Sequence, residues 1–198
     1  MKALAVCCAL VAASPVLAED AELARARKIV AGTCFLCHGV QGESATELFP
    51  RLAAQNAEYI AKQLANFKSG ERKSEIMPRM VGALTPEDMR ALGMYFSRQE
   101  SPPHPTTDAR LAERGRVIYR KGGAATEVAA CVGCHGERGH GSAQLPRLAG
   151  QVASYLAAQI RNFGARMRTN DNAVMHTIAE KMTDDEIRAV AEYLSGLD

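Results

Sequence analysis

The pentapeptide CFLCH at residues 34–38 returns as CVGCH at residues 131–135, and the rest of the chain is organised around this pair. The tetrapeptide PRLA at residues 50–53 likewise returns at residues 146–149. Further matched positions follow in the same order. They pair Gln55 with Gln151, Tyr59 with Tyr155, Gln63 with Gln159, Asn66 with Asn162 and Phe67 with Phe163. An internal repeat of this length indicates that the chain is a duplicated domain.

A proline-rich stretch separates the two copies. Three prolines in the segment SPPHP at residues 101–105 exclude a helix and predict a semi-rigid, extended linker over residues 100–107. We therefore expect one domain over residues 19–99 and a second over residues 108–198. Domains this small bury a limited share of their surface and often depend on an added stabiliser.

Both copies are predicted to be helical, so the expected fold class is all-α. No stretch shows the sustained alternation of apolar and polar residues that a half-buried strand requires. The expected helices cover residues 21–31, 56–68 and a stretch from Thr85, then residues 108–119, a stretch around 155–163 and a stretch from Thr183. Asp20 is expected to cap the first helix. Thr85-Pro86-Glu87-Asp88 and Thr183-Asp184-Asp185-Glu186 have the composition of helix starts.

The first residues predict export. Lys2 precedes an apolar run, and Val16-Leu17-Ala18 ends that run on a small residue, which is the pattern of a signal peptide over residues 1–18 cut after Ala18. The run is too short to span a bilayer comfortably, and no later stretch is long and apolar enough, so we expect a soluble mature protein. A lipoprotein anchored at Cys7 is the weaker alternative, because the apolar region before that residue is short.

The mature chain keeps four cysteines, and each pair is followed directly by a histidine. Cys-x-x-Cys-His is the attachment motif of c-type haem. The spacing lets both thiols reach the two vinyl groups on one edge of the macrocycle, and the histidine then lies beneath the iron. The sequence thus predicts two covalently bound haem c groups. Their expected thioether ligands are Cys34, Cys37, Cys131 and Cys134, and their expected axial ligands on one side are His38 and His135.

The cysteines have three alternative uses. Structural zinc needs four ligands at each site, and each copy offers two cysteines and a few histidines. A redox-active cysteine pair belongs in a thioredoxin-like strand and helix, which the pattern does not contain. Plain disulfides remain as the third alternative, because an exported protein permits them.

The sixth iron position is predicted from the repeat. Methionine is the common partner of histidine in electron-transfer haems. Met77 lies eight residues before Thr85, and Met175 lies eight residues before Thr183, so these two are the expected ligands. The remaining candidates lack a sulfur at the matching position or sit where packing is expected; they are Met80, Met89, Met94, Met167 and Met182. His176, next to Met175, is the rival ligand in the second copy.

The surroundings of the haem can also be predicted. A ligating histidine needs an acceptor for its other ring N–H, and the carbonyls of Pro50 and Pro146 are the candidates. Arg51 and Arg147 are expected either to pair with haem propionates or to be exposed and solvated. Two further histidines are expected to be solvated rather than ligating, namely His104 in the linker and His140 in a glycine-rich loop.

These motifs together resemble the cytochrome c4 family, in which two class I cytochrome c domains lie in tandem. The resemblance covers essentially the whole mature chain. It rests on CFLCHGVQG, FPRLAAQ and the Met77 region in the first copy, and on CVGCHGERG, LPRLAGQ and RTNDNAVM in the second. It implies two haems facing each other across a pseudo-twofold interface, in the periplasm of a Gram-negative bacterium. It also implies electron delivery from a quinol-oxidising complex, such as quinol–cytochrome c reductase, to a terminal oxidase or reductase, with some members associated with the membrane surface.

The expected function is electron transfer without catalysis, because two six-coordinate irons leave no open site for a substrate. The formal net charge of +2 shows no nucleic-acid footprint. The alternative is a haem-bearing subunit of an enzyme complex such as flavocytochrome sulfide dehydrogenase, since such subunits resemble this fold; the chain itself has no dinucleotide fingerprint. A gas or redox sensor would need a weak or absent sixth ligand.

Overall fold

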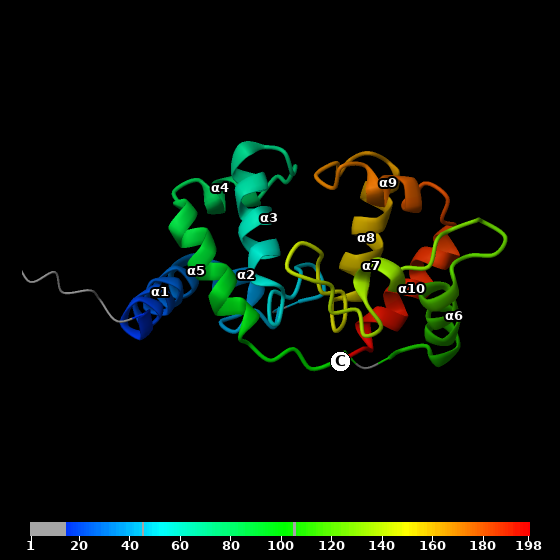
Figure 1. Ribbon diagram of the computed structural model, residues 1–198, viewed down its shortest axis with the longest axis horizontal. Helices are drawn as coiled ribbons and strands as arrows, with labels where there is room; N and C mark the ends of the chain where they lie inside the picture. The colour runs from blue at the N-terminus through cyan, green and yellow to red at the C-terminus, as the bar shows by residue number, and fades with distance from the viewer. Residues whose placement is uncertain (1–14, 45, 105) are drawn as a thin grey trace, which may run out of the picture.

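The chain folds into two helical domains that lie side by side and are joined by an extended segment (Figure 1). A computed structural model describes residues 15–44, 46–104 and 106–198. The first domain contains α1 (Pro15–Ile29), the π-helical segment η1 (Val30–Cys34), α2 (Phe35–His38), α3 (Ala57–Ser69), α4 (Met77–Val81) and α5 (Pro86–Ser97). The second contains α6 (Ala109–Lys121), α7 (Val132–His135), α8 (Ala153–Gly164), α9 (Val174–Ala179) and α10 (Asp184–Ser195). The described residues contain no strand, which confirms the all-α prediction.

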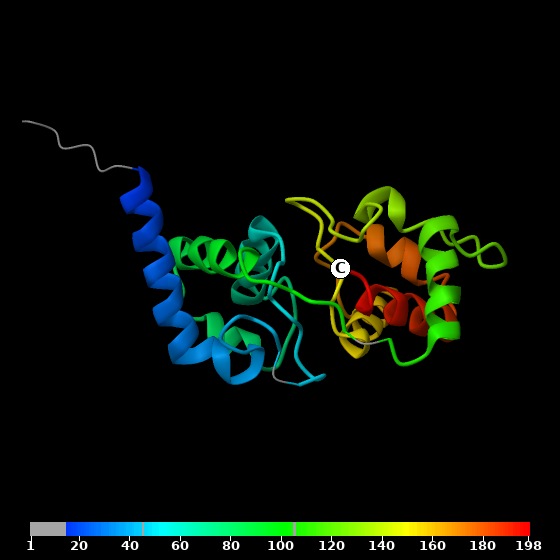
Figure 2. The same ribbon diagram turned by 90° about the horizontal axis from the view of Figure 1, so that it is seen from below.

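Each domain has its own hydrophobic core. In the first, α5 packs against both α1 and α3, and the fully buried residues there include Val30, Leu92 and Phe96. In the second, α10 packs against α6 and α8, and Tyr119 and Leu194 are fully buried. The helices α1 and α6 lie at the two far ends of the molecule, whereas α3 and α8 face each other in the middle (Figures 1 and 2).

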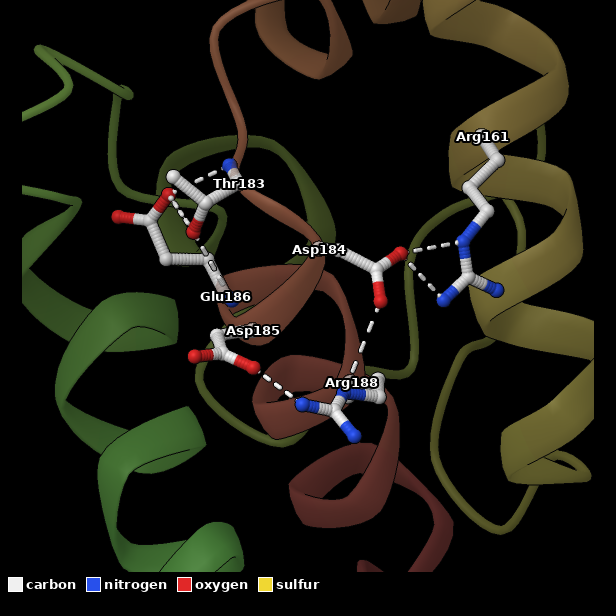
Figure 3. Close-up of polar contacts among 6 residues, drawn as sticks. All are labelled: Arg161, Thr183, Asp184, Asp185, Glu186 and Arg188. Carbon is white, nitrogen blue, oxygen red and sulfur yellow. Dashed lines mark hydrogen bonds and ion pairs between the residues drawn. The ribbon is translucent and has the colours of Figure 1, made fainter.

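The last helix of each domain begins at the predicted threonine, and both starts are capping boxes. Thr85 caps α5, because its hydroxyl accepts from the backbone N–H of Asp88 and the Asp88 carboxylate accepts from the N–H of Thr85. Thr183 and Glu186 make the same exchange at α10, at 3.2 Å and 2.8 Å (Figure 3). Asp184 adds an ion pair to Arg161 of α8 at 2.6 Å, so the start of α10 is tied to its neighbour.

The predicted start of the first helix is wrong. Asp20 lies inside α1, which begins at Pro15. The helix continues in the N-terminal direction because Leu17 and Ala18 are strong helix formers and Pro15 suits a first helical position. Residues 1–14, which make up most of the predicted signal peptide, lie outside the described residues. Among the described helices, none has the length and hydropathy needed to cross a membrane.

The two copies differ just before the Cys-x-x-Cys-His motif. In the first domain, α1 passes through η1 directly into Cys34. In the second, α6 ends at Gly122, whose φ of 80° suits glycine, and a loop over residues 122–130 precedes Cys131. A single bridge between Gly123 and Val128 closes that loop. Because of this additional loop, the first helix lies further from the Cys-x-x-Cys-His motif in the second copy than in the first. The motifs themselves still align.

The crossing of α6 and α10 depends on a glycine. A Cβ built at Gly115 would lie 1.9 Å from the carbonyl oxygen of Ala189. Gly115→Ala is therefore expected to lower the free energy of unfolding of the second domain by about 3 kcal/mol, because backbone cannot yield as a flexible side chain can. Thermal unfolding followed by circular dichroism measures the change. Gly82→Ala is the control, since a Cβ at Gly82 would meet its nearest atom at 3.4 Å, an ordinary contact distance, and its φ is −54°. Equal melting temperatures for the two variants would contradict the close approach.

Candidate functional site

The two Cys-x-x-Cys-His motifs each form a single helical turn, α2 and α7. The first cysteine of each motif is the N-cap of the turn and the second lies within it, and residues three apart share a face of a helix. All four thiols are free, which does not support the disulfide alternative. Burial raises the pKa of Cys34, and raises that of Cys131 to about 11, so these thiols are protonated at neutral pH.

The histidine of each motif is buried and held by a proline carbonyl. The Nδ1 of His38 lies 2.9 Å from the carbonyl oxygen of Pro50, and that of His135 lies 3.4 Å from the carbonyl oxygen of Pro146. This confirms the predicted acceptors. Burial lowers the pKa of both imidazoles, although each proline carbonyl opposes the shift. A neutral ring that donates through Nδ1 carries its lone pair on Nε2, which is the state that ligates a metal.

The segment after each histidine is fixed by a buried tyrosine. Tyr95 of α5 donates from its hydroxyl to the carbonyl oxygen of Val40 at 2.9 Å. Tyr119 of α6 donates in the same way to Gly136 at 2.6 Å. The two domains thus hold this segment with the same hydrogen bond, which comes from a different helix in each domain. Each tyrosine holds the chain that turns away from the haem-binding motif, and it thereby limits how far the histidine ring can move.

The two predicted methionine ligands occupy matching places. Met77 is the first residue of α4 and Met175 the second residue of α9. The backbone N–H of Met77 donates to the Ser74 hydroxyl at 3.2 Å, and that of Met175 donates to an Asp171 carboxylate oxygen at 2.6 Å. Both methionine side chains are half-buried. Their assignment as ligands remains a prediction, and the structure places each at the start of a short helix with a fixed backbone.

The other methionines differ in environment. Met80 and Met167 are 44% and 67% exposed, whereas Met89 is only 5% exposed and belongs to the packing of α5. Met182 packs against the core of the second domain. The packing of Met89 and Met182 is the role that the sequence predicts for them.

The rival ligand His176 is engaged on both ring nitrogens. Its Nδ1 lies 3.0 Å from the carbonyl oxygen of Phe163, and its Nε2 lies 3.2 Å from a carboxylate oxygen of Glu180. A ring whose two nitrogens both face protein oxygens would have to give up one of these contacts to bind a metal. This geometry disfavours the bis-histidine alternative in the second domain.

A reciprocal pair of glutamines joins the two domains. Gln151 accepts from the backbone N–H of Arg51 and donates to its carbonyl oxygen, both at 2.8 Å. Gln55 does the same to Arg147, at 2.7 Å and 2.9 Å. Each glutamine therefore bonds to the loop of the other domain that supplies the histidine's proline acceptor. The pseudo-twofold interface that the family resemblance implies is matched here by an exchange of equivalent hydrogen bonds.

A second bridge begins at Arg72, just after α3. Its guanidinium donates to Gln63 of its own domain at 2.8 Å. It also donates to the Tyr155 hydroxyl at 2.7 Å and to Gln159 at 3.0 Å, both on α8 of the other domain. The guanidinium lies over the ring of Phe67, 4.6 Å from its centroid. Arg72 thus contacts both domains with hydrogen bonds to neutral oxygens.

Arg168 makes the equivalent contacts from the second domain. Its guanidinium donates to Gln159 of its own domain at 2.8 Å. Across the interface it donates to the Tyr59 hydroxyl at 2.8 Å and to Gln63 at 3.0 Å. It lies over Phe163 at 4.5 Å from the ring centroid. We call these residues the interface arginine cluster; it comprises Arg72, Arg168, Gln63, Gln159, Tyr59 and Tyr155.

Of the two alternatives for Arg51 and Arg147, the structure tests only the solvated one. Arg51 is only 8% exposed, so the solvated alternative is wrong for it. Its guanidinium donates across the interface to the carbonyl oxygen of Gly150 at 2.8 Å and to that of Pro102 in the linker. Arg147 is half-buried, and its Nε donates to the carbonyl oxygen of Ala149 at 3.2 Å. The loop is held to the other domain, so the Arg51 side chain is enclosed when the domains meet.

The two remaining histidines are also less solvated than expected. His104 is partly buried, and its Nε2 is enclosed with no hydrogen-bond partner in the described part of the chain. His140 is half-buried, and its Nε2 lies 3.0 Å from a backbone oxygen of Asp198. Both lie where the linker and the C-terminus pass the interface, which was not visible from local composition. Among residues 15–44, 46–104 and 106–198, no group of three or more His, Cys, Asp and Glu side chains could hold a metal ion.

The interface residues recur in the repeat, but their spacing alone indicates no function. Gln55, Tyr59 and Gln63 each have a counterpart in the second copy, and the sequence gives no reason for the match. Arg72 and Arg168 were not matched at all, although each lies nine residues after its domain's cluster glutamine. The sequence signal for these residues is that polar side chains recur at matching positions of helices that are expected to bury one face.

Family models match both halves of the chain. Residues 112–198 match the model for cytochrome c. Residues 21–96 match the model for subunit III of cbb3-type cytochrome c oxidase. The two matches fall on the two domains.

Whole-length relatives give a more specific comparison. Cytochrome c4 of Thiocapsa roseopersicina is 41% identical over 170 residues, which cover 84% of this chain and 88% of the relative. A thiosulfate dehydrogenase electron acceptor of Stutzerimonas stutzeri (strain A1501) is 37% identical, covering 93% of this chain and 92% of that one. The crystal structure of reduced recombinant cytochrome c4 from Pseudomonas stutzeri superposes with a TM-score of 0.81 at 35% identity, covering 88% of this chain and 97% of that chain.

Proposed function

This chain belongs to the cytochrome c4 family of electron carriers, and from that premise we propose that it is a periplasmic protein with one covalently bound haem c in each domain. We assign the domains to residues 19–99 and 108–198, joined by residues 100–107 and preceded by a signal peptide at residues 1–18. The donor is proposed to be a quinol-oxidising complex and the acceptor a terminal oxidase or reductase. Association with the membrane surface is proposed to be peripheral.

The donor atoms of each domain suit this cofactor. The two free thiols of each motif are available for thioether bonds. The adjacent imidazole is buried, its Nδ1 faces a proline carbonyl, and its Nε2 has no hydrogen-bond partner in the described part of the chain. A half-buried methionine starts a short helix in each domain. We assign the thioethers to Cys34, Cys37, Cys131 and Cys134, and the axial ligands to His38, Met77, His135 and Met175.

Haem supplies a centre that stores and releases one electron. The side chains of this protein hold it in place and tune it. Pro50 and Pro146 orient the histidine rings through Nδ1, which favours a well-defined bond from Nε2. Met77 and Met175 would hold the iron through sulfur, a ligand that stabilises the reduced state and raises the reduction potential. An iron held on both sides has no position for a substrate, so the chain transfers electrons without making or breaking other bonds.

The observation that carries the proposal is the duplication of one complete donor set. Each domain offers two thiols, a histidine fixed by a proline carbonyl, and a methionine at the start of a short helix. A single copy has a modest false-positive rate as a motif. Two copies, in equivalent places of a repeated fold, argue strongly for two equivalent cofactors.

A second candidate concerns the electron donor. A relative that is 37% identical over most of both chains is described as a thiosulfate dehydrogenase electron acceptor. A sulfur-oxidising dehydrogenase is therefore the alternative donor, in line with the alternative of a haem-bearing subunit in an enzyme complex. Stopped-flow mixing of the oxidised protein with each donor separates the two, since the physiological donor reduces it within milliseconds to seconds at micromolar concentration.

We expect purified mature protein to contain two haems per chain, both resistant to acid–acetone extraction because they are bound through thioethers. A pyridine haemochrome assay against quantitative amino-acid analysis measures the ratio. Near-infrared spectra of the oxidised protein are expected to show the charge-transfer band of methionine-to-iron ligation. A ratio of one haem per chain would contradict haem binding in one of the two domains. Haem that can be extracted would contradict covalent attachment.

A further inference from the structure

Two glutamine side chains at the domain interface are buried and held by backbone groups. Gln151 is 6% exposed and Gln55 is 7% exposed. The Oε1 of Gln151 accepts from the backbone N–H of Arg51 in the other domain at 2.8 Å, and from that of its own neighbour Val152 at 2.9 Å. Its Nε2 donates to the carbonyl oxygen of Arg51 at 2.8 Å. Three hydrogen bonds therefore fix this amide group just before α8 begins.

Gln55 occupies the equivalent place just before α3. Its Oε1 accepts from the backbone N–H of Arg147 in the other domain at 2.7 Å, and from that of its own neighbour Asn56 at 3.0 Å. Its Nε2 donates to the carbonyl oxygen of Arg147 at 2.9 Å. In the described part of the chain, the backbone N–H groups of Arg51 and Arg147 have no other acceptor. Each of these N–H groups thus depends on a glutamine from the opposite domain.

The peptide unit that Gln151 holds also binds a haem-motif histidine. The carbonyl of Pro50 and the N–H of Arg51 belong to one peptide unit, which is planar, so its two polar groups point in opposite directions. The carbonyl oxygen lies 2.9 Å from the Nδ1 of His38, and the N–H donates to Gln151. One rigid group therefore connects the histidine of the first domain to a glutamine of the second.

The second domain repeats this arrangement. The peptide unit of Pro146 and Arg147 has its carbonyl oxygen 3.4 Å from the Nδ1 of His135, and its N–H donates to Gln55. A peptide group that donates through its N–H is a stronger acceptor at its carbonyl, because successive hydrogen bonds polarise one another. A stronger bond at Nδ1 in turn makes the opposite ring nitrogen a better donor to a metal. Each glutamine can therefore act on a histidine that it does not touch.

We infer that Gln151 is a positioning residue for the haem ligand His38, and that Gln55 is a positioning residue for His135. Each domain thereby sets part of the reduction potential of the haem in the other domain. The inference rests on the proposed function, since it requires a haem iron bound to each histidine. It gives this pair of repeated glutamines a role in electron transfer in addition to joining the two domains.

Leucine variants of the holoprotein test the inference, because leucine is close to glutamine in size but can neither form its hydrogen bonds nor bind iron. Gln151→Leu is expected to weaken the bond at the Nδ1 of His38, so that this imidazole stabilises ferric iron less. The potential of the first haem should therefore rise, while that of the second stays near the parental value. Gln55→Leu should give the opposite pattern. Spectroelectrochemical titration gives both potentials, and NMR spectra of isotope-labelled protein at stepped potentials show which histidine belongs to each.

Ser154→Ala is the matched control. The Ser154 hydroxyl also donates across the interface, to the carbonyl oxygen of Glu47 at 2.8 Å, but it does not bond to the peptide unit of Pro50 and Arg51. Its removal costs the interface one hydrogen bond, and both potentials should remain at the parental values. A shift as large as that of Gln151→Leu would overturn the inference, because a general loosening of the interface would then explain both results.

The crossed pattern of the two shifts is decisive. Potentials that stay at the parental values in both leucine variants contradict the inference, and so does a shift confined to the haem of the substituted domain. Haem content is measured first on every sample. Fewer than two covalent haems in the parent contradicts the proposed function, whereas two haems with unmoved potentials contradicts only the role of the glutamines.

A measurement on the parent holoprotein covers the case in which the leucine variants do not assemble. If Gln151 positions the Pro50 carbonyl, then the opening that frees the Arg51 N–H also weakens the bond to His38. Hydrogen exchange of the Arg51 N–H and of the His38 ring N–H is therefore expected to rise together as denaturant is added. A His38 ring N–H that stays protected after the Arg51 N–H exchanges freely would overturn the inference without any variant.

Discussion

Replacing Met77 with histidine is expected to lower one reduction potential of the holoprotein by on the order of a few tenths of a volt and to leave the other largely unchanged. Axial ligands set haem potentials over a range of about 0.8 V, and a second imidazole stabilises the oxidised iron relative to a thioether sulfur. Met77 starts α4, with its backbone N–H held by Ser74. A redox titration monitored in the visible bands resolves the two centres, and loss of the near-infrared methionine band reports the ligand exchange.

Met80→His is the matched control for this experiment. Met80 lies three residues further along α4 and is 44% exposed, so it places the same new side chain on the same helix without replacing a ligand. Its two potentials should remain near the parental values. If Met77→His leaves both potentials unchanged, or if Met80→His produces the large shift instead, then Met77 is not the sixth ligand of the first domain.

The double variant Cys131→Ala and Cys134→Ala is expected to reduce the haem content from two per chain to one. The thioethers that hold the second haem cannot form without these thiols, and His135 together with Met175 supplies only reversible axial bonds. The second domain also loses the stabilisation that a bound macrocycle adds to a small core. Mass spectrometry of the intact chain measures the loss as the mass of one haem, and haem staining after denaturing electrophoresis measures it by intensity.

The reciprocal variant, Cys34→Ala with Cys37→Ala, is the control for the second domain's result. It should also retain one haem, but the haem that remains should be the one whose potential is insensitive to substitution at Met77. A double variant that keeps two covalently attached haems would refute the assignment of its cysteines. A variant that loses both haems would show that attachment in one domain depends on attachment in the other.

Local rules of sequence predicted a large part of the structure. The helix starts at Thr85 and Thr183 depend on neighbours within a few residues, so the sequence alone could predict them. Because the chain is a repeat, a prediction for one copy also applies to the matching position of the other. It also led to the acceptors of the histidine rings, because the same proline follows the same motif twice. The iron ligands themselves remain predictions, which the first experiment tests.

The predicted start of the first helix was wrong because the residues before it also favour a helix. Asp20 has the chemistry of an N-cap, yet the residues before it are good helix formers, so α1 extends back to Pro15. A cap residue marks a helix start only when the backbone before it leaves the helix. The environment of His104 was missed for a different reason, since its burial comes from residues far away along the chain.

By itself, the sequence of this protein determined its class, its duplication and the donor atoms offered in each half, because those depend on residue types and short spacings. Only the tertiary structure decided what the repeated polar residues do. Gln55 and Gln151 bond to loops about a hundred residues away, and Arg72 and Arg168 meet only when the two domains face each other. Contacts between segments so far apart leave no local periodicity, and they exist only because a twofold packing of the two copies brings equivalent residues together.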